Sequence, residues 1–230
     1  MASSLASSPV QIRCQGVLFD MDGILISSIA SVERSWTKWA NMRGVDPVLA
    51  CEIAHGCRAI ETVAKLRPDL DSEAELKVIE EIECADGEGL TVLPGVLDLL
   101  HALPANRWTV VTSATERLAR VRLVQSDIPV PTRLVTAESV TQGKPDPAPY
   151  LAGAAILGLA PEECVVFEDT AAGVKAGRDA GCTVIATTFS HPAESLRAAR
   201  YLVPDLTSVA ARVLSDSQGV ALRFTPMAVK

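Results

Sequence analysis

The chain has 230 residues, of which 48% are hydrophobic, and a formal net charge of −7. This length is sufficient for one large domain with a buried core, or for a domain that carries an insertion. The acidic balance and the lack of a Lys/Arg cluster argue against a nucleic-acid partner. No apolar run approaches the roughly 20 residues of a membrane span, so no membrane association is expected.

The N-terminus and the six cysteines bear on where the protein works. The opening MASSLASSPVQ has neither a charged n-region nor an apolar h-region, so it is not a secretory signal. We expect residues 1–11 to form a disordered tail. No cysteine pair has C-x-x-C spacing or a zinc-type arrangement with histidine. We interpret the cysteines as reduced thiols and expect a cytoplasmic protein.

Several apolar runs have the character of buried parallel strands, and helical patterns follow the later ones. The predicted strands are Gly16–Phe19, Trp108–Thr112, Val165–Phe167 and Thr183–Thr187, with a weaker fifth at Arg133–Val135. The predicted helices are Glu116–Gln125, Pro147–Leu157 and Ala171–Ala180. Strands that alternate with helices predict an α/β fold with a Rossmann-like, doubly wound parallel sheet.

A different kind of sequence lies between the first two predicted strands. Residues 29–93 have helical periodicity and little strand character, and Pro94-Gly95 marks the return to the sheet. We therefore predict a small α-helical cap domain over residues 29–93. Residues 1–28 and 94–230 would form the Rossmann-like domain into which it is inserted.

Two aspartates end the first predicted strand, in GVLFDMDGILI. Because side chains alternate along an extended chain, Asp20 and Asp22 fall on the same side, and Gly23 permits a tight turn after them. Two carboxylates at one spot repel each other unless a cation or a proton separates them. They are either exposed turn residues or part of a cation site at the carboxyl end of the strand.

A second acidic pair, Glu168-Asp169, ends another predicted strand, in VVFEDTAAG. Acidic residues at that place are also common as simple helix caps. However, the carboxyl ends of parallel strands meet at one edge of the sheet, which is where such folds bind ligands. An oxygen-rich cluster of this kind suits Mg²⁺.

Two further segments supply groups that suit an anion. Lys144 stands in the stiff loop GKPDPAPY, where it is either solvated or neutralises an anion near the carboxylates. Thr112, Ser113 and Ala114 follow a strand and precede a helix, where hydroxyl and backbone N–H groups bind phosphate. An ordinary Ser/Thr helix cap is the alternative for that segment.

Together and in this order, D-x-D-G, strand-Thr-Ser, G-K-P-D-P and F-E-D-T-x-x-G resemble the four motifs of the haloacid dehalogenase-like hydrolase superfamily. The resemblance covers nearly the whole chain after the tail. It is similar to the branch whose helical cap, called type C1, is inserted just after the first motif.

The resemblance implies a mechanism with Asp20 as the nucleophile that becomes an aspartyl phosphate. Asp22 would protonate the leaving oxygen and then activate water. Mg²⁺ would be held by Asp20, the Asp22 backbone carbonyl and Asp169, with Glu168 in support. Lys144 and the Thr112-Ser113-Ala114 segment would stabilise the transferring phosphoryl group.

The resemblance also narrows the substrate class. Ser27-Ser28 stands where the family often has Asp-Ser, as in the branch that acts on 2-deoxyglucose 6-phosphate and glycerol phosphate. We expect a Mg²⁺-dependent phosphatase of small phosphorylated sugars or polyols. A mutase of the β-phosphoglucomutase type is the alternative, although Val32 stands where such a mutase has histidine. A phosphate-receiving signalling domain is an alternative of another class, although it is about half as long.

The cap holds the candidates for substrate recognition. His55, Gly56 and Arg58 lie in HGCRAIETV, which reads as a loop entering a helix. Arg58 is expected either to clamp a phosphate or sugar hydroxyl or to form an i,i+3 pair with Glu61. His55 is either a ligand or a satisfied core residue. The substrate is expected to be a small phosphomonoester, and the protein a monomer.

Overall fold

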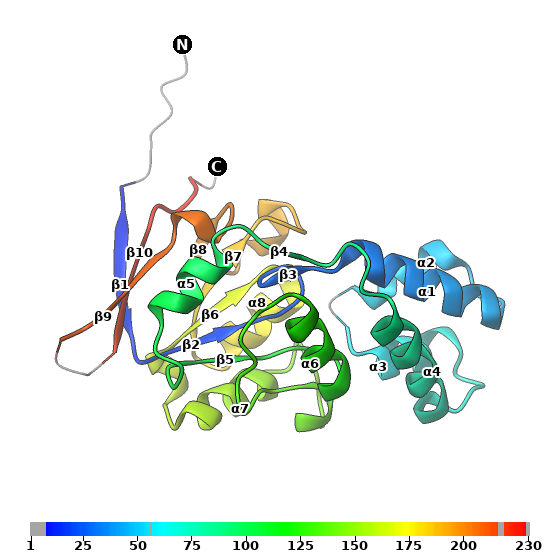
Figure 1. Ribbon diagram of the computed structural model, residues 1–230. Helices are drawn as coiled ribbons and strands as arrows, with labels where there is room; N and C mark the ends of the chain where they lie inside the picture. The colour runs from blue at the N-terminus through cyan, green and yellow to red at the C-terminus, as the bar shows by residue number, and fades with distance from the viewer. Residues whose placement is uncertain (1–7, 56, 216–218, 229–230) are drawn as a thin grey trace, which may run out of the picture.

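A five-stranded parallel sheet lies at the centre of the computed structural model, which describes residues 8–55, 57–215 and 219–228 (Figure 1). The strand order is β5-β2-β6-β7-β8. In chain order the strands are β2 (Gly16–Phe19), β5 (Trp108–Val110), β6 (Cys164–Glu168), β7 (Thr183–Thr187) and β8 (Tyr201–Val203). The winding reverses at β2, which lies between β5 and β6. Open α/β sheets bind their ligands at the carboxyl ends of the strands beside such a reversal.

Both faces of the sheet are buried, and the residues of β2 alternate between them. Val17 and Phe19 belong to one hydrophobic cluster and Leu18 to the other. The helices on the Leu18 face are α7 (Ala148–Leu157) and α8 (Ala171–Asp179). Those on the opposite face are α5 (Val96–Ala102) and α6 (Glu116–Gln125). The predicted doubly wound architecture is therefore confirmed.

A second, antiparallel sheet joins the two ends of the chain. Its order is β1-β10-β9, with strands β1 (Val10–Cys14), β9 (Ala210–Val213) and β10 (Val220–Phe224). The predicted disordered tail, residues 1–11, was therefore too long, because residues 10 and 11 pair with β10. Residues 1–7 of that tail lie outside the described part of the chain. The local sequence pattern could not predict this pairing, because the partner strand is more than 200 residues away in the chain.

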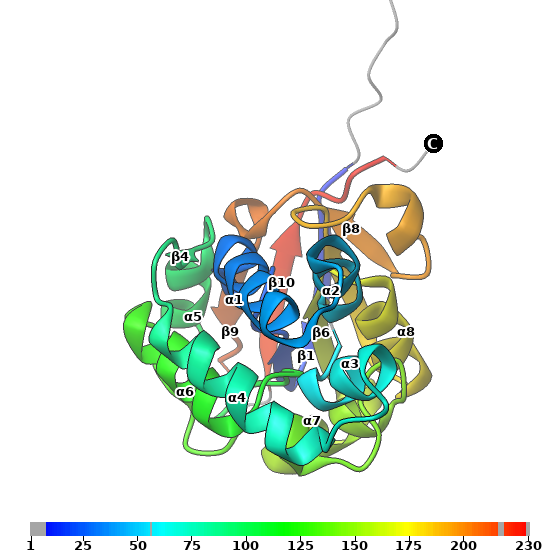
Figure 2. The same ribbon diagram turned by 90° about the vertical axis from the view of Figure 1, so that its right-hand side faces the viewer.

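Four helices, which we call the helical insert, gather at the end of the molecule opposite the β1-β10-β9 sheet (Figures 1 and 2). They are α1 (Ile29–Arg43), α2 (Pro47–Ala54), α3 (Ala59–Leu66) and α4 (Ser72–Ala85). They pack around their own apolar cluster, in which Trp36 and Trp39 meet edge to face at 5.4 Å between ring centroids. The chain enters and leaves the insert through an antiparallel pair, β3 (Ile26–Ser27) and β4 (Thr91–Val92).

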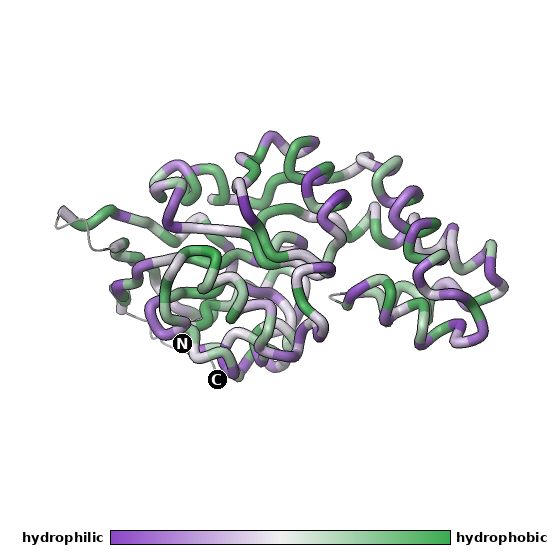
Figure 3. Tube along the Cα trace, turned by 90° about the horizontal axis from the view of Figure 1, so that it is seen from below, coloured by the Kyte–Doolittle hydropathy of each residue, from purple (hydrophilic) through white to green (hydrophobic). Residues whose placement is uncertain are grey.

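The weaker predicted strand at Arg133–Val135 was wrong. Only an isolated bridge between Val111 and Val135 forms there, after a segment that contains Pro129 and Pro131, which have no N–H to donate. The fifth strand is instead β8. Hydrophobic residues concentrate along the central strands, whereas hydrophilic residues recur on the helices (Figure 3). None of the helices in the described part of the chain has both the length and the apolar character of a transmembrane segment.

Candidate active site

Asp20 lies directly at the carboxyl end of β2, at the reversal of the sheet. It is 7% exposed, and its Oδ1 accepts a hydrogen bond from the Met21 backbone N–H at 2.7 Å. The turn that follows requires Gly23, which has a φ of 81°; a Cβ there would stand 1.9 Å from Asp169 Oδ2. The glycine thus allows the two acidic segments to approach each other.

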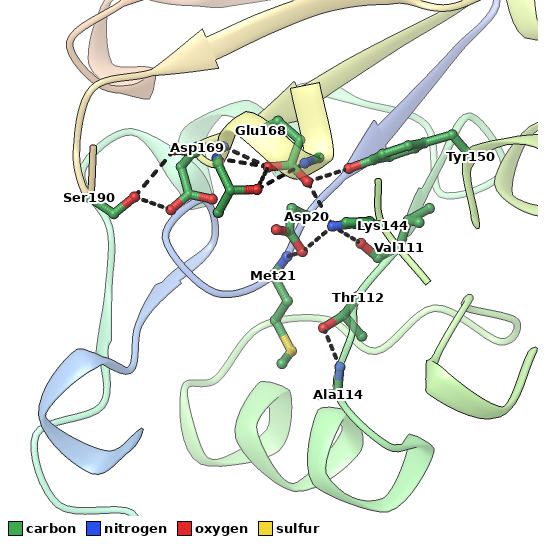
Figure 4. Close-up of polar contacts among 12 residues, drawn as sticks. Asp20, Met21, Val111, Thr112, Ala114, Lys144, Tyr150, Glu168, Asp169 and Ser190 are labelled. Carbon is green, nitrogen blue, oxygen red and sulfur yellow. Dashed lines mark hydrogen bonds and ion pairs between the residues drawn. The ribbon is translucent and has the colours of Figure 1, made fainter. Parts of the chain in front are cut away.

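Lys144 binds two of the carboxylates at once (Figure 4). Its Nζ lies 3.0 Å from Asp20 Oδ1 and 2.7 Å from Glu168 Oε1, and it donates to the Val111 carbonyl at 3.2 Å. Burial opposes the lysine charge, but the neighbouring carboxylates hold its pKa above the ordinary value. The ammonium is therefore charged and fixed beside the Asp20 carboxylate.

Glu168, the last residue of β6, is fully buried and saturated with donors. One oxygen accepts from Lys144 and from the Tyr150 hydroxyl at 2.8 Å, and the other accepts from the backbone N–H groups of Asp169 and Thr170. Burial raises the pKa of this carboxyl, but Lys144 and these hydrogen bonds outweigh it and lower the pKa overall. Glu168 is therefore an ionised anchor for the lysine.

Asp20, Glu168 and Asp169 offer carboxylate oxygens that all lie within 4.8 Å of one another. Asp169 Oδ1 is buried and has no hydrogen-bond partner, while its Oδ2 accepts from Ser190 Oγ. Burial and then the charge of Glu168 raise the pKa of Asp169 to about 7. Burial also raises the pKa of Asp20 well above its ordinary value, against the effect of Lys144. A set of oxygen donors with one unsatisfied oxygen and excess negative charge fits a hard divalent cation.

Asp22 is turned away from this cluster. Its side chain is 33% exposed, lines the cavity above the sheet, and pairs with Arg122 of α6 at 3.0 Å. The carboxylate is therefore placed where it can meet a bound molecule, and only its backbone carbonyl remains a candidate metal ligand.

The segment before α6 forms another wall of the same cavity. Thr112, Ser113 and Ala114 all line it, and the Ala114 N–H donates to Thr112 Oγ1 at 3.1 Å. Because that hydroxyl accepts from the backbone, its own proton is available to an anion. Thr115 caps α6 by accepting from the Leu118 N–H.

The candidates in the insert are only partly brought to the cavity. His55 lines it and pairs through Nδ1 with the Cys51 carbonyl at 2.7 Å, whereas Gly56 lies outside the described residues. Arg58 is not among the described residues that line this cavity, and its role in substrate binding stays a prediction. Its guanidinium pairs with Glu61 and donates to the carbonyls of Val140 and Thr141, in the loop before Lys144.

The two tryptophans of α1 take different places. Trp39 is fully buried in the insert and donates to Glu75 at 2.8 Å. Trp36 packs against it and also lines the cavity. Trp39 therefore packs in the core of the insert, whereas Trp36 also shapes the cavity.

Sequence reasoning missed several residues of the site. Glu80 and Glu83 of α4, Arg122 of α6, and Ser190 and His191 after β7 also line the cavity. Two signals in the sequence could have found some of them. The first is that Arg122 shares a buried helical stripe with Leu118 and Ala119, where a charged residue is rarely buried unless it is paired. The second is that the Ser-His pair follows the carboxyl end of β7, the same edge of the sheet as the acidic pairs.

The chain is similar to a known family and to several named enzymes. A family described as haloacid dehalogenase-like hydrolase matches residues 14–181. Hexitol phosphatase A of Escherichia coli is 44% identical over 190 residues, which cover 80% of this chain and 87% of that protein. Glycerol-1-phosphate phosphohydrolase 2 of Saccharomyces cerevisiae is 36% identical over 199 residues, which cover 80% of this chain and 80% of that protein.

Solved structures share the fold. A hydrolase from Pseudomonas syringae, 22% identical, matches with a TM-score of 0.74 over 84% of this chain and 94% of that one. β-Phosphoglucomutase from Clostridium difficile, 19% identical, also has a TM-score of 0.74, over 84% and 92%. With the family match, the relatives and the acidic site at the switch point in agreement, the chain belongs to the haloacid dehalogenase-like hydrolases.

Proposed function

We propose that the protein is a phosphatase of small phosphorylated sugars or polyols that works through an aspartyl phosphate on Asp20. The observation that carries the proposal is the position of Asp20: at the switch point of the sheet, fixed by Lys144, and open to a cavity with hydroxyl groups on its far wall. The names of the relatives, which act on hexitol, glycerol 1-phosphate and 2-deoxyglucose 6-phosphate substrates, support the same class.

In the first step, Asp20 attacks phosphorus and the bond to the leaving oxygen breaks, while Asp22 gives that oxygen a proton. In the second step, Asp22 takes a proton from water, which attacks the phosphorus and releases phosphate and free Asp20. Lys144 stabilises the charge on the phosphoryl oxygens from one side, and Thr112 from the other. The first step needs Asp22 as an acid and the second needs it as a base.

We propose Mg²⁺ as the metal, held by Asp20, Asp169 and the Asp22 backbone carbonyl, with Glu168 supporting through Lys144. Bound there, it would offset negative charge between the nucleophile and the phosphoryl group. The unpartnered Asp169 Oδ1 is the feature that supports this assignment.

The wall of the cavity formed by the insert favours a substrate with one phosphate. It is lined by Trp36, Val32 and Leu76 and by the carboxylates of Glu80 and Glu83. Among the described lining residues, Arg122 is the one Lys or Arg, and it already serves two carboxylates. A second phosphate would meet acidic groups there, whereas the hydroxyls of a polyol would donate to them. This favours hydrolysis over the mutase alternative, in which a bisphosphate must bind.

We further propose that residues 29–93 act as a cap on the domain formed by residues 1–28 and 94–230. The protein would work as a monomer in the cytoplasm, and its six free thiols suit a reducing compartment. Size-exclusion chromatography with light scattering tests the monomer.

The test is phosphate release from hexitol, glycerol and hexose phosphates, with Mg²⁺ and with chelator. We expect release from a few small monophosphates, lost in chelator and in Asp20→Asn. The matched control is Asp98→Asn, on an exposed face of α5, which should retain full activity. Full activity of Asp20→Asn would refute the mechanism. Conversion of one phosphate ester into another, with total organic phosphate retained, would instead identify a mutase.

A further inference from the structure

Arg122 joins Asp22 to the helical insert. It projects from α6 with only 3% of its side chain exposed. One terminal nitrogen donates to Asp22 Oδ1 at 3.0 Å, and the other donates to Glu83 Oε1 of α4 at 3.2 Å. The Nε is buried and has no partner among the described residues. The guanidinium thus donates hydrogen bonds to one residue of the sheet domain and to one residue of the insert.

The hydrogen bond from Arg122 restricts the orientation of the Asp22 side chain. The aspartate lies in a turn after β2, and its partly exposed carboxylate can adopt more than one rotamer there. A hydrogen bond from a buried guanidinium fixes Oδ1 and leaves Oδ2 for the leaving oxygen or for water. Because arginine is not deprotonated in proteins, it orients the carboxylate without exchanging a proton itself.

Glu83 in turn fixes the arginine. Its side chain is 7% exposed, and burial raises its pKa to about 7 against the lowering effect of Arg122. It belongs to a helix that meets α6 at further points, including a hydrogen bond from Thr115 to Glu80. Arg122 therefore has this geometry only while α4 lies against α6.

We propose that Arg122 is a positioning residue that orients Asp22 for proton transfer, and that Glu83 couples this orientation to the closed position of the insert. The inference rests on the proposed function, since it concerns the acid and base assigned there. With α4 displaced, the arginine loses one of its two anchors and Asp22 loses its fixed orientation. Proton transfer would then be efficient only in a closed site, from which bulk water is excluded.

The test compares two substrates in single-turnover experiments with enzyme in excess. Glycerol phosphate needs a proton on its leaving oxygen, whereas the phenolate released from p-nitrophenyl phosphate does not. We expect Arg122→Met to slow alcohol release from glycerol phosphate by roughly tenfold to hundredfold, as loss of orientation does, and phenolate release by no more than about threefold. Inhibition by inorganic phosphate should be unchanged.

Three further variants keep the test valid if Arg122→Met folds poorly. Arg122→Met/Glu83→Gln leaves no unpaired buried charge and should show the same selective loss. Glu83→Gln alone should show a smaller loss with the same selectivity. Arg120→Met is the matched control, because Arg120 lies on the same helix as Arg122 but pairs with Glu116 of that helix rather than with the insert; it should not change the ratio between the two substrates.

A double-mutant cycle separates this inference from the proposed function. In an Asp22→Asn background, Arg122→Met should cause no further loss, because the arginine acts through that carboxylate. Full activity of Asp22→Asn would refute the proposed mechanism itself. A strongly slowed Asp22→Asn with a measurable residual rate, together with equal slowing of both substrates by Arg122→Met or an additive loss in the double variant, would overturn only the role of Arg122.

Discussion

Lys144 sits between two buried carboxylates, and its charge is part of both the fold and the chemistry of the site. Its Nζ lies within 3.0 Å of both Asp20 and Glu168. A buried ion pair contributes little net stability compared with a well-packed apolar replacement, but removing one partner leaves an uncompensated charge. The lysine is therefore a residue at which stability and activity can be separated by mutation.

We expect Lys144→Met to abolish turnover and to lower the free energy of unfolding by about 3–5 kcal/mol. Denaturant titration and phosphate release measure the two effects. Lys144→Met/Glu168→Gln should regain part of the stability but none of the activity. Lys175→Met, which removes an exposed lysine paired with Asp179, should change stability by less than about 1 kcal/mol. Unchanged stability of Lys144→Met would contradict the network described.

The raised pKa values predict how stability without metal depends on pH. The pKa of Asp169 rises from 3.8 to about 7, and that of Glu83 from 4.5 to about 7. Between the ordinary and the raised value, the folded protein binds protons that the unfolded chain does not. Stability is thus favoured at low pH and declines as pH rises through 7.

In chelator, we therefore expect Tm to fall between pH 5.5 and pH 8. Mg²⁺ should raise Tm more at pH 8 than at pH 5.5, because the metal needs Asp169 ionised. Thermal unfolding at both pH values, with and without Mg²⁺, measures this, and Asp169→Asn should lose the Mg²⁺ effect. A Mg²⁺ effect that is larger at pH 5.5 would contradict the prediction.

At the residue scale, the sequence was most informative about residues at the ends of strands, because the sheet fixes where those residues lie. Asp20, Glu168 and Asp169 follow or end neighbouring strands, so topology alone brings them together. Lys144 contacts Asp20 and Glu168, while its role in stabilising the phosphoryl group stays a prediction. Arg122 was not predictable in this way, because its role depends on how two helices far apart in the chain pack together.

At the element scale, the sequence pattern correctly predicted those strands and helices whose ends are set by residues close to them in the chain. The bounds of β2, β7 and α6 agree with the predicted ranges because continuous apolar runs and a Thr cap define them. The β1-β10-β9 sheet was missed because β1 and β9 are largely exposed or half-exposed, and because β1 pairs with β10 across nearly the whole chain. Strand identity there is decided by the partner rather than by propensity.

The first turn of α8 depends on a close approach between helix and strand. A Cβ at Gly173 would stand 1.7 Å from Glu168 Oε1. We expect Gly173→Ala to displace Glu168, to lower stability by about 1–3 kcal/mol and to reduce turnover at least tenfold, since Lys144 loses its anchor. Urea unfolding and steady-state kinetics measure the two effects.

The control for this prediction is Gly44→Ala at the end of α1. Gly44 has a φ of 66°, but an added Cβ meets no atom within 4 Å. The strain of the left-handed conformation should cost about 1–2 kcal/mol while turnover per folded molecule stays normal. A Gly173→Ala enzyme with normal turnover would show that the site tolerates a shift of Glu168.

At the scale of the whole molecule, two further polar contacts tie the insert to the sheet domain, besides the buried Arg122–Glu83 pair. Arg58 of the insert donates to loop carbonyls near Lys144, and Arg117 of α6 pairs with Glu80 and Glu81 of α4. Both ties involve polar groups at the margin of the cavity. Contacts of this kind can be broken and re-formed as substrate enters and product leaves.

We expect Arg58→Ala/Arg117→Ala to favour the open arrangement of the insert. KM should rise about threefold to tenfold, and amide hydrogen exchange should become faster in α3 and α4 but not in β2 or β6. Steady-state kinetics and exchange mass spectrometry measure this. Arg200→Ala, on an exposed residue near β8, is the control, and equal acceleration throughout both parts of the molecule would contradict the prediction.

The β3-β4 pair gives the insert one more property. Ile26 lies opposite Val92 and Ser27 opposite Thr91, so the points where the chain departs and returns are adjacent. The sheet domain therefore requires only that these two ends be close, whatever joins them. We therefore expect that a different segment of chain could be placed between these two strands without displacing Asp20, Lys144 or Glu168, since none of the three lies in the insert.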